Sequence, residues 1–444
     1  MAHTSDTAAE KKLLTRTDLF SMAIGQIIGV GIMTMTGIAI GFTGRSVVFA
    51  YLLAGILSIL TSIPQILIGG TANFLGGQYS QIAVLSGRKM AGIYTYVNLF
   101  TLFAISMYTL SFADYFLSLF PGANGRLVGV VAITILFAMH FVGVKQAARL
   151  QNLMSLVLAL AIASYIVFGV GSIQPDFFAA QQFMTGGVPG FLLASVYLIF
   201  ASGGATYVVN YSSQAKNPTR DIPFVIIVST AAVVLVYAVM SAVAAGVLPV
   251  AEVANQPLSV SAQVFMPPAL YTFFVVGGAM FALLTTLNFS IGMMVYPALR
   301  ACEDGWLPRK LAACNNRFGT AHWILLIFYL VGVVPIVAGL DLTTIANSTV
   351  IITQVCKALV IFSAMQMPRK LQELWSTSKF HVSKPALYGI CISALSITLL
   401  AIVILFVSTS PIQIAGNLIL LGIAVALTLL RHRHVILNPS YTKN

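Results

Sequence analysis

The sequence predicts an all-α polytopic membrane protein with about 12 transmembrane helices. Of its 444 residues, 59% are hydrophobic and only 8% are charged, whereas roughly 25% of the residues in a soluble domain are charged. The apolar residues run along the whole chain, in stretches that match the ~20 residues of one membrane crossing. This composition excludes a soluble globular domain, a disordered chain and a soluble domain on a single anchor. It also excludes a membrane β-barrel, whose strands alternate apolar and polar residues over about ten positions.

Polar connections divide the chain into twelve apolar segments, and the longest connections are residues 300–321 and 368–385. No soluble domain is expected at either end, and the polar first 13 residues do not resemble a removable signal peptide. The predicted spans are residues 17–42, 46–70, 91–119, 126–143, 150–171, 188–212, 222–248, 266–299, 322–339, 344–367, 386–408 and 411–430.

The basic residues fall almost entirely on one predicted side of the membrane. With a cytoplasmic N-terminus, all of the 23 Lys and Arg residues except three lie in cytoplasmic segments. Arg45 and Arg126 lie outside, and Lys357 lies within a span. Because cytoplasmic loops collect Lys and Arg, this bias predicts both termini in the cytoplasm and an even number of spans. It also accounts for the net charge of +12 without a nucleic-acid partner.

Glycines interrupt the first and the sixth predicted spans. The first carries Gly25, Gly29 and Gly31, and the sixth carries Ser202-Gly203-Gly204. Each helical glycine costs about 1 kcal/mol relative to alanine, and paired interruptions in two halves of a chain are typical of inverted-repeat transporters. Unwound backbone there offers amides to a carboxylate and carbonyls to an ammonium, as a zwitterionic substrate would require. Close helix packing remains the alternative for the Gly25–Gly29 pattern taken alone.

Four motifs, in order along the chain, resemble those of the amino acid–polyamine–organocation (APC) superfamily of permeases. Together they extend over about residues 15–320, and the last three spans match in hydropathy only. The motifs are Gly25-Gln26-Ile27-Ile28-Gly29-Val30-Gly31-Ile32-Met33, Leu75-Gly76-Gly77-Gln78-Tyr79, Lys216-Asn217-Pro218-Thr219-Arg220-Asp221-Ile222-Pro223 and Asp304-Gly305-Trp306-Leu307-Pro308.

The resemblance implies a LeuT-type fold, in which two inverted five-helix repeats are followed by two further helices. It also implies alternating-access transport of amino acids or related amines. The expected organisation is a cytoplasmic N-terminal tail over 1–16, a first repeat over 17–171, a second repeat over 188–367, spans 11 and 12 over 386–430, and a cytoplasmic C-terminal tail over 431–444.

The resemblance also implies a substrate site at the two interruptions. Amides around Val30 and Gly31 would hold the substrate carboxylate, and the Ile27 carbonyl would accept from the ammonium, helped by carbonyls near Phe200 and Gly203. Phe200 would be an aromatic gate. The implied substrate-binding residues are Gln26, Ile27, Gly29, Val30, Gly31, Phe103, Ser106, Met107, Phe200, Ala201, Ser202, Gly203 and Gly204.

The chain departs from the family pattern at several positions. Val30 replaces the usual Ser of the first motif, and Ala205-Thr206 replaces the usual Phe-Glu after the sixth-span glycine. Leu158 falls where some members carry a fifth-span lysine that supports coupling. A mechanism that depends on that lysine is therefore not expected here.

Lys357 is the main candidate for coupling substrate transport to the movement of an ion, because an ionisable residue inside a span is a functional candidate by default. The alternative is a snorkelling lysine that packs against polar neighbours. Thr285, Thr286 and Asn288 of the eighth span could offer oxygen atoms to a sodium ion, although Ser and Thr in membrane helices commonly bond their own backbone.

The expected substrate is a neutral amino acid, because no carboxylate is predicted near the midplane and burying an unpaired charge is expensive. An acidic amino acid or an amine, moved by antiport, is the alternative, and exchange and proton-coupled symport both remain open. The expected partners are the small-molecule substrate, a proton or sodium ion, and the lipid bilayer. No cofactor, metal or nucleic acid is expected, and the oligomeric state is open. The expected location is the cytoplasmic membrane of a bacterium.

Two other function classes are disfavoured by the sequence. An intramembrane enzyme needs a nucleophile with a base, or a metal site, and the spans carry neither H-E-x-x-H nor paired Asp. No G-x-x-x-x-G-K-[ST] loop is present for an ATP-driven pump. A channel or non-transporting receptor remains a remote alternative, which a flux measurement would distinguish.

Overall fold

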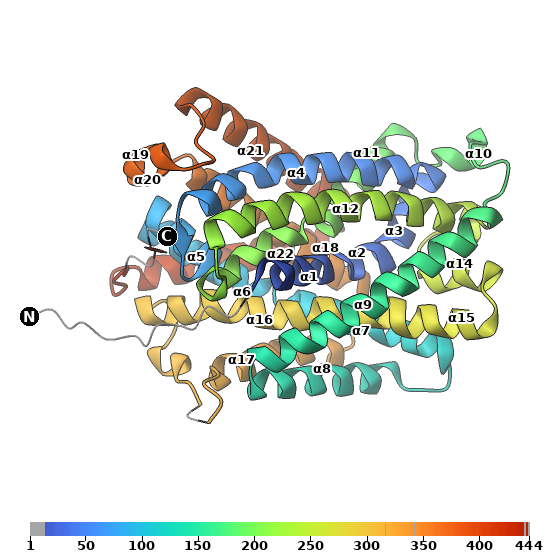
Figure 1. Cartoon of the computed structure of the whole chain (residues 1–444), viewed down its shortest axis with the longest axis horizontal. Helices are drawn as coiled ribbons and strands as arrows, with labels where there is room; N and C mark the ends of the chain where they lie inside the picture. The colour runs from blue at the N-terminus through green and yellow to red at the C-terminus, as the bar shows by residue number, and fades with distance from the viewer. Residues whose placement is uncertain (1–13, 316, 341, 439–440, 443–444) are drawn as a thin grey trace, which may run out of the picture.

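A computed structural model describes residues 14–315, 317–340, 342–438 and 441–442, and in these residues the chain is a bundle of α-helices. Figure 1 shows that most of the long helices run along the longest axis of the molecule, with α10, α14 and α15 at one end and α5, α19 and α20 at the other. The predicted all-α polytopic class is confirmed.

The elements follow one another with short connections. They are α1 (Arg16–Ile27), α2 (Val30–Met33), α3 (Met35–Thr43), η1 (Gly44–Ser46), α4 (Val47–Thr71), β1 (Asn73–Phe74), α5 (Gly77–Ser86), α6 (Arg88–Phe100), α7 (Phe103–Leu119), α8 (Gly125–Val142), α9 (Val144–Gly169), η2 (Val170–Ser172), α10 (Ala180–Phe183), α11 (Gly187–Ser202), η3 (Gly204–Gln214), α12 (Pro218–Gly246), α13 (Val250–Val253), α14 (Leu258–Phe265), α15 (Pro268–Phe273), η4 (Phe274–Met280), α16 (Phe281–Asp304), η5 (Arg309–Ala312), α17 (His322–Val337), α18 (Leu342–Ala364), α19 (Met367–Lys370), α20 (Gln372–Thr377), α21 (Lys384–Val407), α22 (Pro411–Arg431) and β2 (Tyr441–Thr442).

Ten helical segments of the described chain are long and apolar enough to cross a membrane. This number is below the predicted twelve for two reasons. The apolar helix α17 has only 16 residues, and the first predicted span is broken into α1, α2 and α3, with α3 and α4 counted as one segment. Every predicted span nevertheless falls on helix, because an apolar segment in lipid must satisfy its backbone groups internally.

Local sequence explains where several helices begin and end. Thr15 and Asp18 form a capping box at the start of α1, in which the Asp18 amide donates to Thr15 Oγ1 and the Thr15 amide donates to the Asp18 carboxylate. A capping serine precedes α21 and α22, and a proline occupies the second position of α21 and the first of α22, where the missing amide hydrogen costs little. Helix α16 ends at Asp304 of the fourth motif, and Gly305 follows as its cap with a φ of 95°, which favours glycine.

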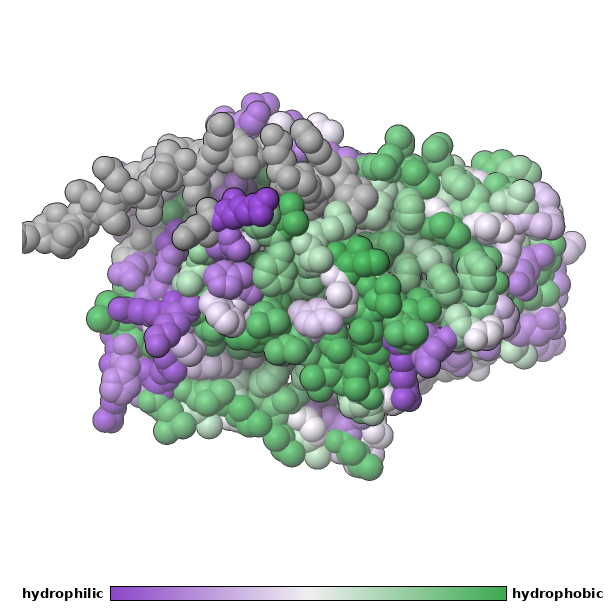
Figure 2. All heavy atoms as spheres, turned by 90° about the horizontal axis from the view of Figure 1, so that it is seen from below, coloured by the Kyte–Doolittle hydropathy of each residue, from purple (hydrophilic) through white to green (hydrophobic). Residues whose placement is uncertain are grey.

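The outer surface carries many large apolar side chains. Val407 is 83% exposed and Ile412 is 85% exposed, which water would disfavour and lipid tolerates. Figure 2 shows hydrophobic residues gathered in the middle of one face, with hydrophilic residues concentrated toward both ends. Together with the ten apolar helical segments, this distribution identifies an integral membrane protein.

The C-terminal segment is folded against the bundle, which the predicted tail over 431–444 did not anticipate. β2 pairs antiparallel with β1, so that Phe74 lies opposite Tyr441. The Asn438 amide donates to Asp304 Oδ1 at 3.0 Å, and Tyr79 donates to Asp304 Oδ2 at 2.6 Å. Asp304 of the fourth motif therefore anchors the C-terminal segment to the end of α16.

Candidate functional site

The first predicted span is interrupted at Ile28 and Gly29, between α1 and α2. Backbone groups beside the interruption find partners on other helices, as the membrane interior requires. The Gly25 carbonyl accepts the hydroxyl of Thr286 on α16 at 2.8 Å, and the Ile27 carbonyl accepts the hydroxyl of Tyr237 on α12. The Gly31 carbonyl accepts the hydroxyl of Tyr51 on α4 at 2.8 Å.

The glycines of this segment also allow close packing. A Cβ atom at Gly29 would lie 1.8 Å from Thr286 Oγ1, and one at Gly25 would lie 2.0 Å from Gln151 Nε2 of α9. Both distances are far below van der Waals contact, so a side chain at either position would require neighbouring groups to move. Helix interruption and close helix packing, the two interpretations of the Gly25–Gly29 pattern, are therefore compatible. The glycines lie at the interruption and also let this segment approach α9 and α16.

The second interruption separates α11 from η3 at Gly203, whose amide donates to the Phe200 carbonyl at 3.3 Å. The two interruptions lie against each other. A Cβ atom at Gly204 would lie 3.1 Å from the Gln26 carbonyl oxygen, and one at Gly31 would lie 2.9 Å from the Ala201 carbonyl oxygen. The structure thus brings together two segments that are separated by more than 150 positions in the chain.

A single cavity lies between these interruptions. Of the residues predicted from the sequence, Gln26, Ile27, Gly31, Phe200, Ala201, Gly203, Gly204 and Lys357 line it. The remaining lining residues come from α4, α5, the connection between α6 and α7, α7, α11, η3, α16 and α18. The lining residues from α4, α5 and η3 are largely polar. The remaining lining residues are Thr61, Gln65, Gln78, Thr101, Leu102, Ala104, Ile105, Tyr108, Ile199, Thr206, Tyr207, Ser290, Met293, Met294, Thr353, Gln354, Cys356, Val360 and Ile361.

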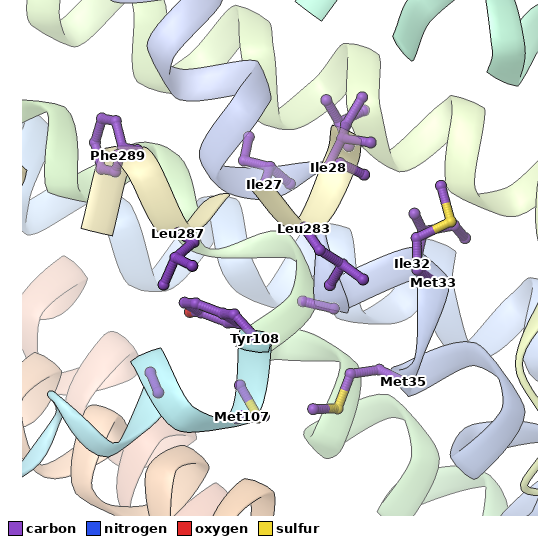
Figure 3. Close-up of a cluster of buried hydrophobic side chains, with 14 of the residues drawn as sticks. Ile27, Ile28, Ile32, Met33, Met35, Met107, Tyr108, Leu283, Leu287 and Phe289 are labelled. Carbon is purple, nitrogen blue, oxygen red and sulfur yellow. The ribbon is translucent and has the colours of Figure 1, made fainter. Parts of the chain in front are cut away.

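Gly29 and Ser202 belong to the interruptions but do not line this cavity in the described structure. Gly29 contacts α16 instead, and the Ser202 hydroxyl donates to the Leu198 carbonyl of its own helix at 3.1 Å. The backbone of Val30 begins α2, while its side chain lies outside the described residues. Figure 3 shows Ile27, Ile28, Ile32 and Met33 of this region beside Leu283 and Leu287 of α16 and Met107 and Tyr108 of α7.

The spacing along the third predicted span places Leu102 against this cavity together with Phe103, Ser106 and Met107. In the structure Leu102, directly before α7, and Ile105 and Tyr108 of α7 line the cavity, while Phe103, Ser106 and Met107 do not. The Ser106 hydroxyl instead donates to the Gly332 carbonyl of α17 at 2.7 Å. Their role in substrate binding stays a prediction. Packing against α17 fixes the rotation of α7 in this conformation, and hydropathy along an apolar helix does not specify that rotation.

The three residues predicted on α16 hold helices together. Thr285 and Thr286 both donate to the Ala282 carbonyl of their own helix and to the Gly25 carbonyl of α1. The Asn288 amide donates to Gln151 Oε1 at 2.9 Å, and Asn288 Oδ1 lies 3.0 Å from His140 Nε2. Their hydrogen-bonding groups are thus engaged with α1, α8 and α9 in this conformation.

Sequence reasoning missed the tyrosines that hold the first interruption in place. Tyr51 and Tyr237 are both fully buried, and their rings meet edge to face with centroids 5.3 Å apart. A buried phenol usually finds a hydrogen-bond partner, so a tyrosine in the middle of an apolar span was a usable signal. The identity of that partner depends on which helices pack together, which sequence alone does not give.

A second cavity lies toward the end of the bundle that carries α14. Its lining includes Asp114, Ser111 and Tyr115 of α7 together with Asn255–Pro257 before α14. Among the residues described as lining the two cavities, none is shared. At the wall of the second cavity, Thr34 donates to Ser111 at 3.1 Å and Tyr115 donates to the Met33 carbonyl at 2.6 Å.

Comparisons with known proteins agree with this architecture. A family model described as amino acid permease matches residues 14–429. The chain is 28% identical to the methylthioribose transporter of Bacillus subtilis (strain 168) over 71% of this chain and 74% of that protein. It is 24% identical to the branched-chain amino acid permease BcaP of Lactococcus lactis subsp. cremoris over 74% of this chain and 75% of that protein. It is 25% identical to the serine/threonine exchanger SteT of Bacillus subtilis over 50% of this chain and 51% of that protein.

The family match covers nearly the whole chain, including the last spans for which the motifs gave no support. It confirms the resemblance to APC superfamily permeases and the expectation of a transporter rather than an enzyme. This integral membrane protein belongs to the amino acid permease family.

Proposed function

We propose that this protein is a secondary transporter that carries amino acids with uncharged side chains across the cytoplasmic membrane by alternating access. The observation that carries the proposal is the single cavity into which both helix interruptions open. Interrupted helices that meet within a bundle supply the dipole ends and free backbone groups that bind zwitterionic substrates in transporters. The names of the related permeases and exchangers support the same substrate class.

In the proposed binding mode, the substrate lies between the two interruptions. Its carboxylate accepts from amides at the start of α2, around Val30 and Gly31, where the helix dipole favours an anion. Its ammonium donates to the Ile27 carbonyl, which already accepts from Tyr237 and has a second lone pair available. Carbonyls near Phe200 and Gly203 complete this subsite, and Phe200 covers the substrate.

The charges of the cavity favour an uncharged substrate side chain over a cationic one. The described lining residues include no carboxylate, and the single cation among them is Lys357. A guanidinium or a second amine would therefore enter a site without a counter-charge, at a high desolvation cost. An acidic amino acid remains the alternative, because Lys357 could neutralise its side chain.

Two cavities without shared lining residues support alternating access. We place the end with the basic loops in the cytoplasm, following the charge bias, with both termini on that side. Transport proceeds by exchange or by proton-coupled symport. Thr285, Thr286, Asn288 and Lys357 remain the proposed coupling residues, and the first two would act by controlling the position of α1, whose Gly25 carbonyl they bind.

The test is flux into liposomes that contain the purified protein, with protein-free liposomes as the control. Each radiolabelled standard amino acid is offered with and without the same compound inside, and with imposed proton or sodium gradients. Uptake that requires internal amino acid identifies an exchanger, and gradient-driven uptake into empty liposomes identifies a symporter. Flux of methylthioribose without flux of any amino acid would contradict the proposed substrate, and absence of all flux would contradict transport.

A further inference from the structure

Lys357 is the only charged side chain among the described residues that line the central cavity. It projects from α18, which also supplies Thr353, Gln354 and Val360 to the same wall. The side chain is half-buried and lines this cavity. The ion pairs of the described chain join Arg16 to Asp221, Arg45 to Asp176 and Arg300 to Glu303, so none of them neutralises Lys357.

The glutamines around the cavity already bond to one another. Gln65 Nε2 donates to Gln81 Oε1 at 2.9 Å, and Gln78 Nε2 lies 3.5 Å from Gln65 Oε1. Tyr94 donates to Gln78 Oε1 at 2.8 Å. On the opposite side, Gln26 Oε1 accepts from Ser290 at 3.2 Å. Three side-chain amide oxygens that line the cavity thus already accept hydrogen bonds within the protein.

The cavity thus holds polar groups that are already bonded within the protein, together with one ammonium that has no hydrogen bond or ion pair to the described residues. An ammonium has three N–H donors and no acceptor capacity. When a substrate displaces water from the cavity, these donors must find an oxygen atom, because a desolvated cation without partners is strongly unfavourable. The substrate itself is the group that enters this space in every transport cycle.

We propose that Lys357 determines substrate specificity by donating hydrogen bonds to an oxygen atom at the end of the substrate side chain. This inference rests on the proposed function, in which the α-carboxylate and α-ammonium occupy the helix interruptions and the side chain extends through the rest of the same cavity. The transported amino acid then carries a side-chain oxygen acceptor. The acceptor is an uncharged amide or hydroxyl, or the carboxylate of an acidic amino acid.

Purely aliphatic amino acids are poor substrates under this proposal. Leucine has nearly the shape of asparagine and aspartate, and valine has nearly the shape of threonine, but neither aliphatic residue offers an acceptor. A site built to hydrogen-bond a polar group discriminates strongly against an isostere that lacks it. We expect asparagine or aspartate to be preferred to leucine, and threonine to valine, by on the order of 10²-fold or more in kcat/KM.

The experiment compares these isosteric sets in liposomes that contain the wild-type protein or Lys357→Met, which keeps the length of the side chain and removes its charge. Lys357→Arg keeps the cation, and Lys370→Met, outside the cavity, is the matched control. The expected result is that Lys357→Met moves the asparagine-to-leucine and threonine-to-valine ratios toward one while leucine and valine flux persists or rises. Lys357→Arg and Lys370→Met should preserve the preference for the oxygen-bearing compounds.

The asparagine-to-leucine and threonine-to-valine ratios distinguish a role of Lys357 in substrate specificity from a role in ion coupling and from an effect on protein stability. A purely coupling role would change the response to proton or sodium gradients and leave the ratios unchanged, which would overturn the proposal. Equal losses for all substrates would overturn it too. If Lys357→Met fails to fold, competition measured on the wild-type protein still tests the proposal. Leucine that inhibits uptake of a radiolabelled substrate as strongly as asparagine and aspartate do would contradict it.

The comparison of aspartate with asparagine shows whether the oxygen that Lys357 binds belongs to a carboxylate or to an uncharged amide. A preference for aspartate over asparagine that depends on Lys357 would support Lys357 as the specificity determinant and would replace the uncharged substrate of the proposed function. Absence of flux for every amino acid would instead contradict the proposed function, an outcome distinct from equal flux of isosteres.

Discussion

Thr286 donates its hydroxyl hydrogen to the carbonyl oxygen of Gly25 across 2.8 Å. The two residues are more than 250 positions apart in the chain, and both lie in the interior of the bundle. The same hydroxyl also donates to the Ala282 carbonyl, four residues earlier on its own helix, at 3.0 Å. Thr286 thus links the end of α1 to α16.

Replacement of Gly29 by alanine should reduce both stability and transport. The added Cβ would lie 1.8 Å from Thr286 Oγ1 and 3.2 Å from the Ala282 carbonyl oxygen, so the segment between α1 and α2 or the facing turn of α16 must move. Overpacking of this kind costs about 1–3 kcal/mol. Thermal unfolding in detergent and amino acid flux in liposomes measure the two effects. Gly389→Ala on α21 is the control, because nothing lies within 4 Å of its Cβ position; equal behaviour of the two variants would refute the close contact.

Tyr237→Phe should alter substrate affinity more than stability. The phenol donates to the Ile27 carbonyl, which is the proposed acceptor for the substrate ammonium. Loss of one such hydrogen bond costs about 0.5–1.5 kcal/mol, and it also frees the carbonyl that the substrate needs. We expect a changed Kd in equilibrium binding with a small change in Tm. The control is Tyr329→Phe, which removes an exposed hydroxyl contact to Thr134; unchanged substrate binding in Tyr237→Phe would argue against a role for Ile27.

Asp221→Asn should make the central cavity more accessible from the end that carries Arg16. Arg16 and Asp221 form an ion pair at 2.6 Å that joins the start of α1 to α12, and Asp221 is buried. Cys356 lines the cavity and is free, so it reports access directly when the other three cysteines are replaced by serine. We expect a several-fold faster alkylation of Cys356 by a thiol reagent.

The control for this experiment is Glu303→Gln, which breaks the more exposed pair that Arg300 and Glu303 form within α16. Such a surface pair contributes ~0–1 kcal/mol and does not join α1 to another helix. If both variants accelerate alkylation of Cys356 equally, the effect is general loosening rather than release of α1.

Removal of residues 432–444 should lower thermal stability while leaving the central cavity intact. The deletion removes the hydrogen bond from the Asn438 amide to Asp304 and the pairing of β2 with β1. It also exposes the apolar surface that Val435, itself 1% exposed, covers. We expect a Tm lower by several degrees with substrate Kd close to that of the full chain. A truncated protein with an unchanged Tm would show that this segment contributes no stability.

Arg45 illustrates why the environment of a charged residue could not be predicted from the sequence. The charge pattern places it in a connection outside the membrane, where most arginines are solvated. In the structure it is fully buried, donating to the Asp176 carbonyl at 2.7 Å and to Gln174 Oε1 at 2.9 Å. These acceptors lie about 130 positions further along the chain, and only folding brings them to the guanidinium.

The sequence by itself determined the class of protein, the position of nearly every membrane segment and the two places where helices break. Those features follow from local composition, because hydropathy over about 20 residues sets a membrane crossing and a cluster of glycines weakens a helix wherever it lies. The predicted residues of both interruptions that line the cavity, from Gln26 to Gly204, were accessible to this reasoning.

Tertiary structure alone decided which face of α7 meets the cavity, which tyrosines hold the interrupted backbone, and that Lys357 shares a cavity with both interruptions. These relationships depend on helix rotation and on contacts between distant segments. In an apolar membrane helix nearly every face is hydrophobic, so periodicity carries little information about rotation. Packing of side chains and the pairing of buried polar groups fix it instead.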